Sequence, residues 1–341
     1  MEQFFFTNRS IITDNGAEKV DTSHSAGATM NLRFGFLNLE TESYRLLPDV
    51  AIKNGNYQDV DYLTDKTQGS AAWFHQLYAD MLKDDKKNDT LVFIHGFQCG
   101  FDCFIQNMQH LQKAYVENDD SNIARIVGFT WPSNNNILQY RADRADARYA
   151  GEAFARGWYK LLQFFSQVVG TDKRCGNGIH LLAHSLGGQV FEQMVHSVSK
   201  GPYAGIGQVF NEIILAAPDV QHDTFEKGKP LYRINDFCER LHVYTHKSDD
   251  ALRISKYTKN FESRLGKNGP VSPFNIPNNV HVVDCTKISD QQTGREKLID
   301  HWYYKNSATV IKDIGQVLNG ADEDQNPQRT YMANQNKYLL K

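Results

Sequence analysis

Short apolar runs alternate with amphipathic stretches along this chain of 341 residues. Six of the runs are almost continuously apolar and rich in β-forming side chains, which is typical of strands buried on both faces of a sheet. Because these runs alternate with helical patterns, we expect an α/β fold, with a mostly parallel central sheet and helices on both faces. The six runs are TLVFIHG from Thr90, ARIVGFTW from Ala124, GIHLLAH from Gly178, EIILAAPD from Glu212, RLHVYTH from Arg240 and NVHVVDC from Asn279.

The helical stretches are recognised by apolar residues that recur every three or four positions. In residues 154–165 the apolar side chains are spaced four, three and four apart, with charged side chains on the opposite side. Trp73, Leu77 and Met81 predict a helix that delivers the chain into the first central strand. After the last central strand, YYKNSATVIKDIGQVLNG predicts a final helix that ends at Gly320.

The two ends of the chain differ in pattern from its centre. Near the start, EQFFFTNR and NLRFGFLNLE predict extra edge strands, and the polar segment 14–30 predicts a loop. We interpret residues 1–320 as a single domain, with edge strands and a helix in 1–86 and the core in 87–320. Residues 321–341 are mostly polar, and we expect an extended or partly mobile tail there.

Composition excludes several classes of partner. Lys and Arg number 37 against 40 Asp and Glu, so nucleic acid and anionic membranes are not expected as main partners. No segment approaches the roughly 18 apolar residues of a membrane span, and the first residues lack the pattern of a secretory signal. The five cysteines show no zinc-type spacing. We expect small buried thiols, with a metal pair or a disulfide between Cys99 and Cys103 as the alternatives, and therefore a cytoplasmic location.

One apolar run ends at a serine in an unusual setting. In GIHLLAHSLGGQVFEQM, which begins at Gly178, Ser185 stands between a buried strand and a helix opened by two glycines. A serine hydroxyl is a weak nucleophile unless a base removes its proton and the backbone projects it toward a carbonyl. A sharp strand-to-helix turn provides that projection when its neighbours are small, as Ala183 and Gly187 are. The alternative interpretation is a serine that only caps the helix.

The order of several motifs resembles that of the α/β-hydrolase superfamily. TNR, FIHGF, TWPS, AHSLGG, SDDAL and DHWYY are similar, in this order, to a poorly characterised, mostly bacterial branch of it, and the likeness spans Thr90 to Asn319. Ala183 stands where most members carry glycine, a small departure because alanine leaves room for the turn. The resemblance implies an α/β-hydrolase fold in which nucleophile, acid and histidine follow in that order.

The resemblance also implies which residues assist the serine. His301, in LIDHWYYKN, follows the last strand at the place of the superfamily's catalytic histidine; the alternative is a histidine that caps the final helix. The acid that orients it is expected to be Asp249, which matches the related branch's pattern of aspartate, any residue, Ala, Leu. Asp219 and Asp250 are the alternative acids.

The tetrahedral intermediate of acyl transfer needs N–H donors for its oxyanion. The resemblance implies the backbone N–H groups of Leu186, which follows the serine, and Phe97, in the loop after the first central strand. Gln98 is the neighbouring candidate in that loop. His95 resembles a loop histidine that shapes the oxyanion hole rather than transferring protons.

Two further features concern the substrate. Trp131, in TWPS, lines either the substrate pocket or the core. Residues 253–279 are long for a connection and begin just after the candidate acid, so we interpret them as a lid or a pocket wall. Their many polar side chains argue against a broad apolar lid for lipid droplets. We therefore expect a small-molecule acyl substrate.

Together these features predict a serine hydrolase that cleaves a carboxylic ester, or a related thioester or amide, through a covalent acyl-enzyme. No metal or cofactor is implied. Activity should fall as the pH drops through about 6–7, because the base must be neutral. The alternatives are an acyltransferase that uses the same residues and a non-catalytic interaction protein that keeps the fold.

Overall fold

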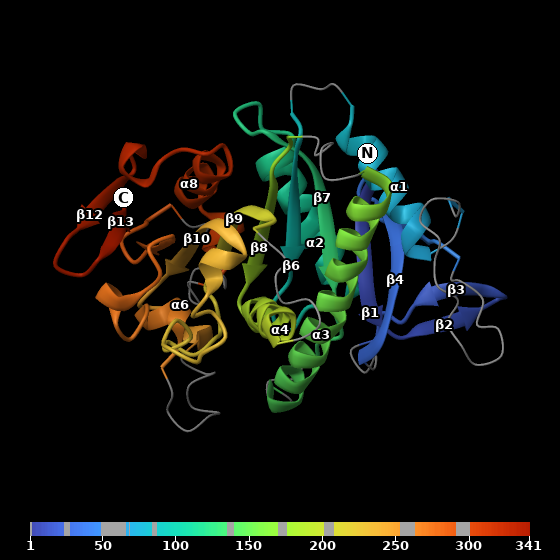
Figure 1. Ribbon diagram of the computed structural model, residues 1–341, viewed down its shortest axis with the longest axis horizontal. Helices are drawn as coiled ribbons and strands as arrows, with labels where there is room; N and C mark the ends of the chain where they lie inside the picture. Colours follow the sequence, from blue (N-terminus) through green and yellow to red (C-terminus); the bar gives the residue numbers. More distant parts are fainter. Residues whose placement is uncertain are drawn as a thin grey trace.

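One large sheet runs across the molecule from end to end (Figure 1). The computed structural model describes residues 2–23, 28–48, 66–67, 69–83, 87–134, 140–169, 176–200, 208–252, 263–290 and 301–341. The strands in these residues are β1 (Glu2–Arg9), β2 (Ile11–Asp14), β3 (Ala17–Val20), β4 (Ala28–Asn38), β5 (Ser43–Leu46), β6 (Asp89–Ile94), β7 (Ile123–Thr130), β8 (Ile179–His184), β9 (Phe210–Ala216), β10 (Cys238–Thr245), β11 (Val280–Asp284), β12 (Arg329–Met332) and β13 (Lys337–Leu340).

The centre of the sheet is parallel. In its described part the sheet has 11 strands in the order β12-β13-β11-β10-β9-β8-β6-β7-β1-β4-β5. Strands β6 to β11 coincide with the six apolar runs and pair in parallel with their neighbours. The mostly parallel α/β sheet predicted from the sequence is thereby confirmed. Because the carboxyl ends of parallel strands lie at the same edge, the loops after β6, β8 and β10 are brought together there.

Helices cover both faces of this sheet, as expected for parallel strands that are apolar on both sides. Helices α1, α3 and α4 pack on one face, around Trp73, Phe154 and Met194. Helices α2, α7 and α8 pack on the other. The bounds are α1 (Gly69–Met81), α2 (Phe101–Leu111), α3 (Tyr140–Phe164), α4 (Gly187–Lys200), α6 (Leu265–Asn268), α7 (Tyr303–Asn306) and α8 (Ala308–Leu318). No helix in the described ranges is long and apolar enough to cross a membrane.

The amino-terminal strands enlarge the sheet on one side. Strand β1 pairs in parallel with β7 and antiparallel with β4, which continues to β5. The segment 14–30, expected to be a loop, instead contains most of a hairpin formed by β2 and β3. Its turn is Asn15–Gly16, with φ of 51° and 79°, and Asn-Gly is a favoured two-residue hairpin turn.

The carboxyl-terminal residues enlarge the sheet on the other side. Residues 321–341, expected to form an extended or mobile tail, contain β12 and β13, and β13 pairs in parallel with β11. Leu339 and Leu340 are buried, which explains why this otherwise polar segment is held against the core. Gly320 ends the preceding helical region with φ +80°, as its predicted capping role requires.

Candidate active site

Ser185 lies at the turn between β8 and α4, at the carboxyl edge of the sheet. Its φ of 54° is in the left-handed region, which costs a residue other than glycine about 1–3 kcal/mol. The turn is held by its backbone: the Ser185 N–H donates to Ala216 O at 2.9 Å, and Ser185 O accepts from the Asp219 N–H at 3.0 Å. A Cβ on Gly187 would lie 2.6 Å from both Ile94 O and His95 O, so no larger residue fits there. This is the geometry of a strained turn that projects a serine.

His301 and Asp249 form a buried pair at the same edge. His301 Nδ1 lies 2.7 Å from Asp249 Oδ2, and relative exposures are 5% for His301, 0% for Asp249 and 5% for Ser185. The other carboxylate oxygen of Asp249 accepts from the Leu252 N–H at 2.9 Å. Lys267 Nζ donates to the Asp249 backbone carbonyl at 2.9 Å. The acid is therefore fixed from both sides and holds the imidazole.

His184 links this pair to the serine turn. Its Nε2 lies 3.2 Å from the backbone carbonyl of His301, and the two imidazole rings are 4.7 Å apart between centroids. Burial, and then the neighbouring His301 and Lys305, lower the pKa of His184 well below that of an exposed histidine. A neutral His184 with its proton on Nε2 donates to that carbonyl. Since His184 precedes Ser185 in the chain, the contact brings the His301 segment to the turn, which sequence reasoning did not predict.

The two alternative acids occupy other environments. Asp219 is buried and forms an ion pair with Arg264 Nε at 3.1 Å, and it also accepts a hydrogen bond from the Tyr140 hydroxyl. Asp250 is half-buried. Among the described residues, Asp249 is the carboxylate that contacts His301.

The loop after β6 packs directly against the serine turn. A Cβ on Gly96 would lie 2.8 Å from the Ser185 Cβ, so the loop and the turn touch at this glycine. Gln98 adopts a left-handed φ of 54°. Within the described chain, the backbone N–H groups of Phe97 and Leu186 donate to no other protein atom. Both N–H groups are therefore without a protein acceptor in the described residues.

Trp131 is fully buried, with 0% exposure. Its indole N–H donates to His95 O at 3.0 Å, and its ring stacks on the His95 imidazole at 5.3 Å between centroids. Of the two roles that the sequence allowed for Trp131, pocket or core, these contacts agree with packing in the core. They also support the loop that carries Phe97.

The sequence expectation for Cys99 and Cys103 is wrong, because these two residues form a disulfide rather than free thiols. Cys99 lies in the loop two residues before α2 begins, and Cys103 lies in the first turn of α2, with 5.1 Å between their Cα atoms. Cys238 and Cys285 are free and buried, as expected. The disulfide removes the argument from free thiols for a cytoplasmic location.

The candidate lid divides into two parts. Residues 253–262 lie outside the described residues. In residues 263–279, the Leu265 N–H donates to Val220 O and the Gly266 N–H donates to Pro218 O, both at 3.0 Å. This part is therefore docked on the loop after β9, next to the serine turn.

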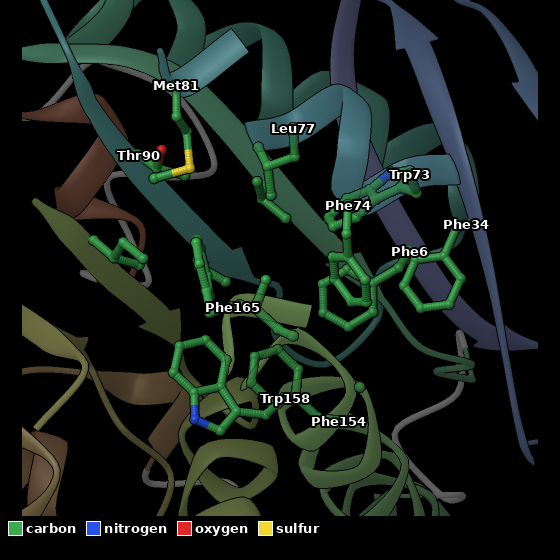
Figure 2. Close-up of a pocket in the computed structure, with 15 residues that line it drawn as sticks. Phe6, Phe34, Trp73, Phe74, Leu77, Met81, Thr90, Phe154, Trp158 and Phe165 are labelled. Atoms are coloured by element: carbon green, nitrogen blue, oxygen red, sulfur yellow. The ribbon is translucent and has the colours of Figure 1, made fainter. Parts of the chain in front are cut away.

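An apolar cavity lies between one face of the sheet and helices α1 and α3. Figure 2 shows its lining, which includes Trp73 and Phe74 from α1 and Trp158 from α3. Thr90 and Ile179, at the starts of β6 and β8, also line it, whereas Ser185 follows the end of β8. With a volume of about 40 Å³ it has room for only a few water molecules. It is not part of the site around Ser185.

Three known proteins show a low similarity to this chain. An uncharacterized protein of Nostoc sp., alr1448, is 24% identical over 266 residues, covering 64% of this chain and 65% of the relative. The lin2722 gene product of Listeria innocua has 11% identity and a TM-score of 0.36, covering 74% of this chain and 98% of that one. A lipase-esterase related protein of Clostridium acetobutylicum has 13% identity and a TM-score of 0.26, covering 67% and 82%. Similarities this low carry no argument about function.

The family comparison is more extensive. Residues 70–320 match the model of a family described as alpha/beta hydrolase of unknown function, DUF900. The match begins in α1 and ends after α8, so it contains the serine turn, the buried acid and the histidine, while β1 to β5 and the terminal hairpin lie outside it. The chain therefore belongs to this alpha/beta hydrolase family.

Proposed function

We propose that this protein is a serine hydrolase of the carboxylesterase type, in which Ser185 attacks an acyl carbonyl. The observation that carries the proposal is the 2.7 Å contact between His301 Nδ1 and the buried Asp249, in a segment that is hydrogen-bonded to His184, the residue before the left-handed serine. A carboxylate-bound imidazole next to a projected hydroxyl is the arrangement that activates serine for acyl transfer.

The tautomer of His301 follows from this contact. An ionised carboxylate only accepts hydrogen bonds, so Nδ1 carries the shared proton and Nε2 has a free lone pair. Nε2 takes the proton of Ser185 as Oγ bonds to the carbonyl carbon. It then delivers this proton to the leaving group as the acyl–leaving-group bond breaks. A water molecule deprotonated by the same nitrogen hydrolyses the acyl-enzyme and restores the serine.

The backbone N–H groups of Phe97 and Leu186 stabilise the oxyanion of both tetrahedral intermediates. Both are available donors in the described chain, and both belong to segments in contact through Gly96 and Ser185. Preorganised donors of this kind supply a large part of the rate enhancement in acyl transfer, on the order of 100-fold or more for a single donor. Trp131 supports this loop from the core side, and a small soluble ester fits the polar composition of residues 253–279.

A fluorophosphonate probe and p-nitrophenyl esters test the proposal together. The wild-type protein should be labelled at Ser185 and should hydrolyse the esters, and Ser185→Ala should lose both. Asp249→Asn should lower kcat by about 10⁴-fold, because the imidazole then loses its orienting charge. Asp250→Asn is the matched control and should retain activity.

Each outcome separates the alternatives. A folded wild type that is neither labelled nor active would refute the serine mechanism and favour a non-catalytic protein. Hydrolysis that survives in Ser185→Ala would show that Ser185 is not the nucleophile. Loss of activity in Asp250→Asn but not in Asp249→Asn would reassign the acid. If labelling occurs but added alcohol captures most of the acyl group, the protein is an acyltransferase rather than a hydrolase.

A further inference from the structure

Arg9 is a buried cation at the carboxyl end of β1, in the TNR segment that the proposed chemistry does not use. Its relative exposure is 1%. Burial lowers the pKa of Arg9 to about 10, against an opposing effect of the Asp21 charge, so the guanidinium remains protonated at neutral pH. Burying a charge is costly unless its hydrogen bonds are satisfied, and this cost calls for a structural reason.

The guanidinium reaches the loop after β6 from a distant part of the chain. Arg9 Nη2 donates to the Cys99 backbone carbonyl at 2.8 Å, across 90 positions of sequence. Arg9 Nε donates to Thr130 Oγ1 at 3.0 Å, at the end of β7. The parallel pairing of Thr7 with Thr130 sets the register of β1 against β7, which places the guanidinium of Arg9 at the carboxyl ends of the strands. The Arg9 side chain thus binds both the Cys99 end of the loop after β6 and the hydroxyl of Thr130.

The Thr130 hydroxyl in turn contacts His95, at the start of the same loop. Because Thr130 Oγ1 accepts from Arg9, its own proton is available for His95 Nε2, 3.3 Å away. The Trp131 N–H also donates to this nitrogen, at 3.1 Å. Burial, and then the charge of Arg9, lower the pKa of His95 to about 3, so the imidazole is neutral. With Nε2 accepting, the ring proton resides on Nδ1.

The Nδ1 proton fixes one particular peptide group. His95 Nδ1 donates to the Gly96 carbonyl at 2.9 Å. That carbonyl and the N–H of Phe97 belong to the same peptide unit, which is planar and trans, so the two groups point in opposite directions. Fixing the Gly96 carbonyl toward His95 therefore fixes the direction of the Phe97 N–H.

We infer that Arg9 is a positioning residue of the oxyanion hole: it holds Cys99 directly and, through Thr130 and His95, orients the peptide whose N–H is contributed by Phe97. This inference rests on the proposed function. Arg9 touches neither the substrate nor the serine, and it acts on the transition state only through the loop.

A second buried arginine offers a matched control. Arg125, on β7, is also buried, and its Nη1 donates to the Asn88 carbonyl at 2.7 Å and to Thr90 Oγ1 at 3.2 Å. It also pairs with Asp80, at 2.6 Å. These contacts lie at the amino-terminal edge of the sheet, away from Ser185. Removing Arg125 disturbs the fold in a comparable way without touching the loop.

The experiment compares Arg9→Lys and Arg9→Met with Arg125→Met by steady-state hydrolysis of a p-nitrophenyl ester, fluorophosphonate labelling rate and urea unfolding. We expect Arg9→Met to lower kcat and the labelling rate by about 10–100-fold while KM changes less than about twofold, because the oxyanion interaction exists only in the transition state. Arg9→Lys retains the charge and one of the two hydrogen bonds, so its loss should be intermediate. Guanidinium ion added to Arg9→Ala should restore part of the labelling rate.

Four results would overturn the inference or the function on which it rests. If Arg9→Met is folded and keeps the wild-type kcat, or if Arg125→Met loses as much kcat at equal stability, the inference is wrong. If Arg9→Met raises KM and leaves kcat unchanged, Arg9 contributes to substrate binding and not to the oxyanion hole. A wild type that no probe labels refutes the proposed function itself, which is distinct from a labelled wild type whose Arg9 variants react normally.

Discussion

Replacing Gly96 by alanine measures how tightly the loop after β6 and the serine turn are packed. The added methyl group would lie 2.8 Å from the Ser185 Cβ and 3.0 Å from His184 Nδ1. Carbon atoms in ordinary contact are about 3.5–4.0 Å apart. The loop and the turn must therefore separate by roughly 0.7 Å or more to admit the methyl group.

This separation should affect catalysis more than stability. Overpacking of this size costs about 1–3 kcal/mol of unfolding free energy. A displacement on the order of 1 Å between reacting groups lowers the rate by about 100-fold. Because the methyl group moves the Phe97 N–H away from Ser185, Gly96→Ala should lose about 10–100-fold in kcat for a p-nitrophenyl ester and in fluorophosphonate labelling rate, with KM little changed. Urea unfolding gives the accompanying stability loss.

The same substitution in open space is the control. A Cβ on Gly315, inside α8, would meet no atom within 4 Å. Gly315→Ala should gain about 0.5–1 kcal/mol, since alanine is favoured over glycine within a helix, and should keep the wild-type kcat. A Gly96→Ala variant with wild-type kcat and labelling rate would show that the loop and the turn are not in the close contact described here.

Three other predictions address the stability of the same region. Reducing the Cys99–Cys103 disulfide should lower the unfolding free energy by about 2 kcal/mol, because the bond closes a short loop, and replacing both cysteines by alanine should have the same effect. Identical urea midpoints with and without reductant would contradict this prediction. Burial lowers the pKa of His95 and of His184, so below about pH 6.5 the unfolded chain binds more protons than the folded one. The free energy of unfolding should therefore fall by about 1.4 kcal/mol for each of these residues with each pH unit below that value. Equal unfolding free energies at pH 7.5 and 5.5 would contradict this prediction. Asp219→Ala leaves its arginine partner buried without this carboxylate and should cost about 3–5 kcal/mol, measured by thermal and urea unfolding; a loss below 1 kcal/mol would argue against a buried ion pair.

The central sheet was predictable because each of its strands shows the required apolar character within its own few residues. A parallel strand covered by helices on both faces must be apolar at nearly every position, so each of the runs from β6 to β11 is recognisable without its neighbours. The turn at Ser185 was also predictable, because only small residues admit it: a Cβ added at Gly187 would lie 2.6 Å from two carbonyl oxygens.

Two hairpins, one of them a separate two-stranded sheet, were missed for different reasons. The turn between β2 and β3 carries a recognisable Asn15–Gly16 signal, but the flanking strands are mostly exposed and polar, so no apolar run marks them. The hairpin of β12 and β13 is stabilised by burial of Leu339 and Leu340 against the core. Two apolar residues are too few to distinguish a docked strand from a polar tail.

The supports of the candidate site were not predictable, because they join residues far apart in the chain. The hydrogen bond of Arg9 to Cys99 spans 90 positions, and that of His184 to His301 spans 117. Neither contact leaves a local pattern of spacing or polarity. The disulfide is the opposite case: its two cysteines are close in sequence, but pairing depends on how the loop after β6 enters α2.

The order of strands in the sheet has a consequence for synthesis on the ribosome. His184 and His301 are 117 positions apart, so at about 5–20 residues per second His301 is made about 6–23 s after the segment that will form the serine turn. The proposed nucleophile therefore lacks its base during this interval and is not yet activated to attack an acyl group. Strand β13 is made after β11 and covers its otherwise free edge, so in the interval between them this edge is open to pairing with other chains.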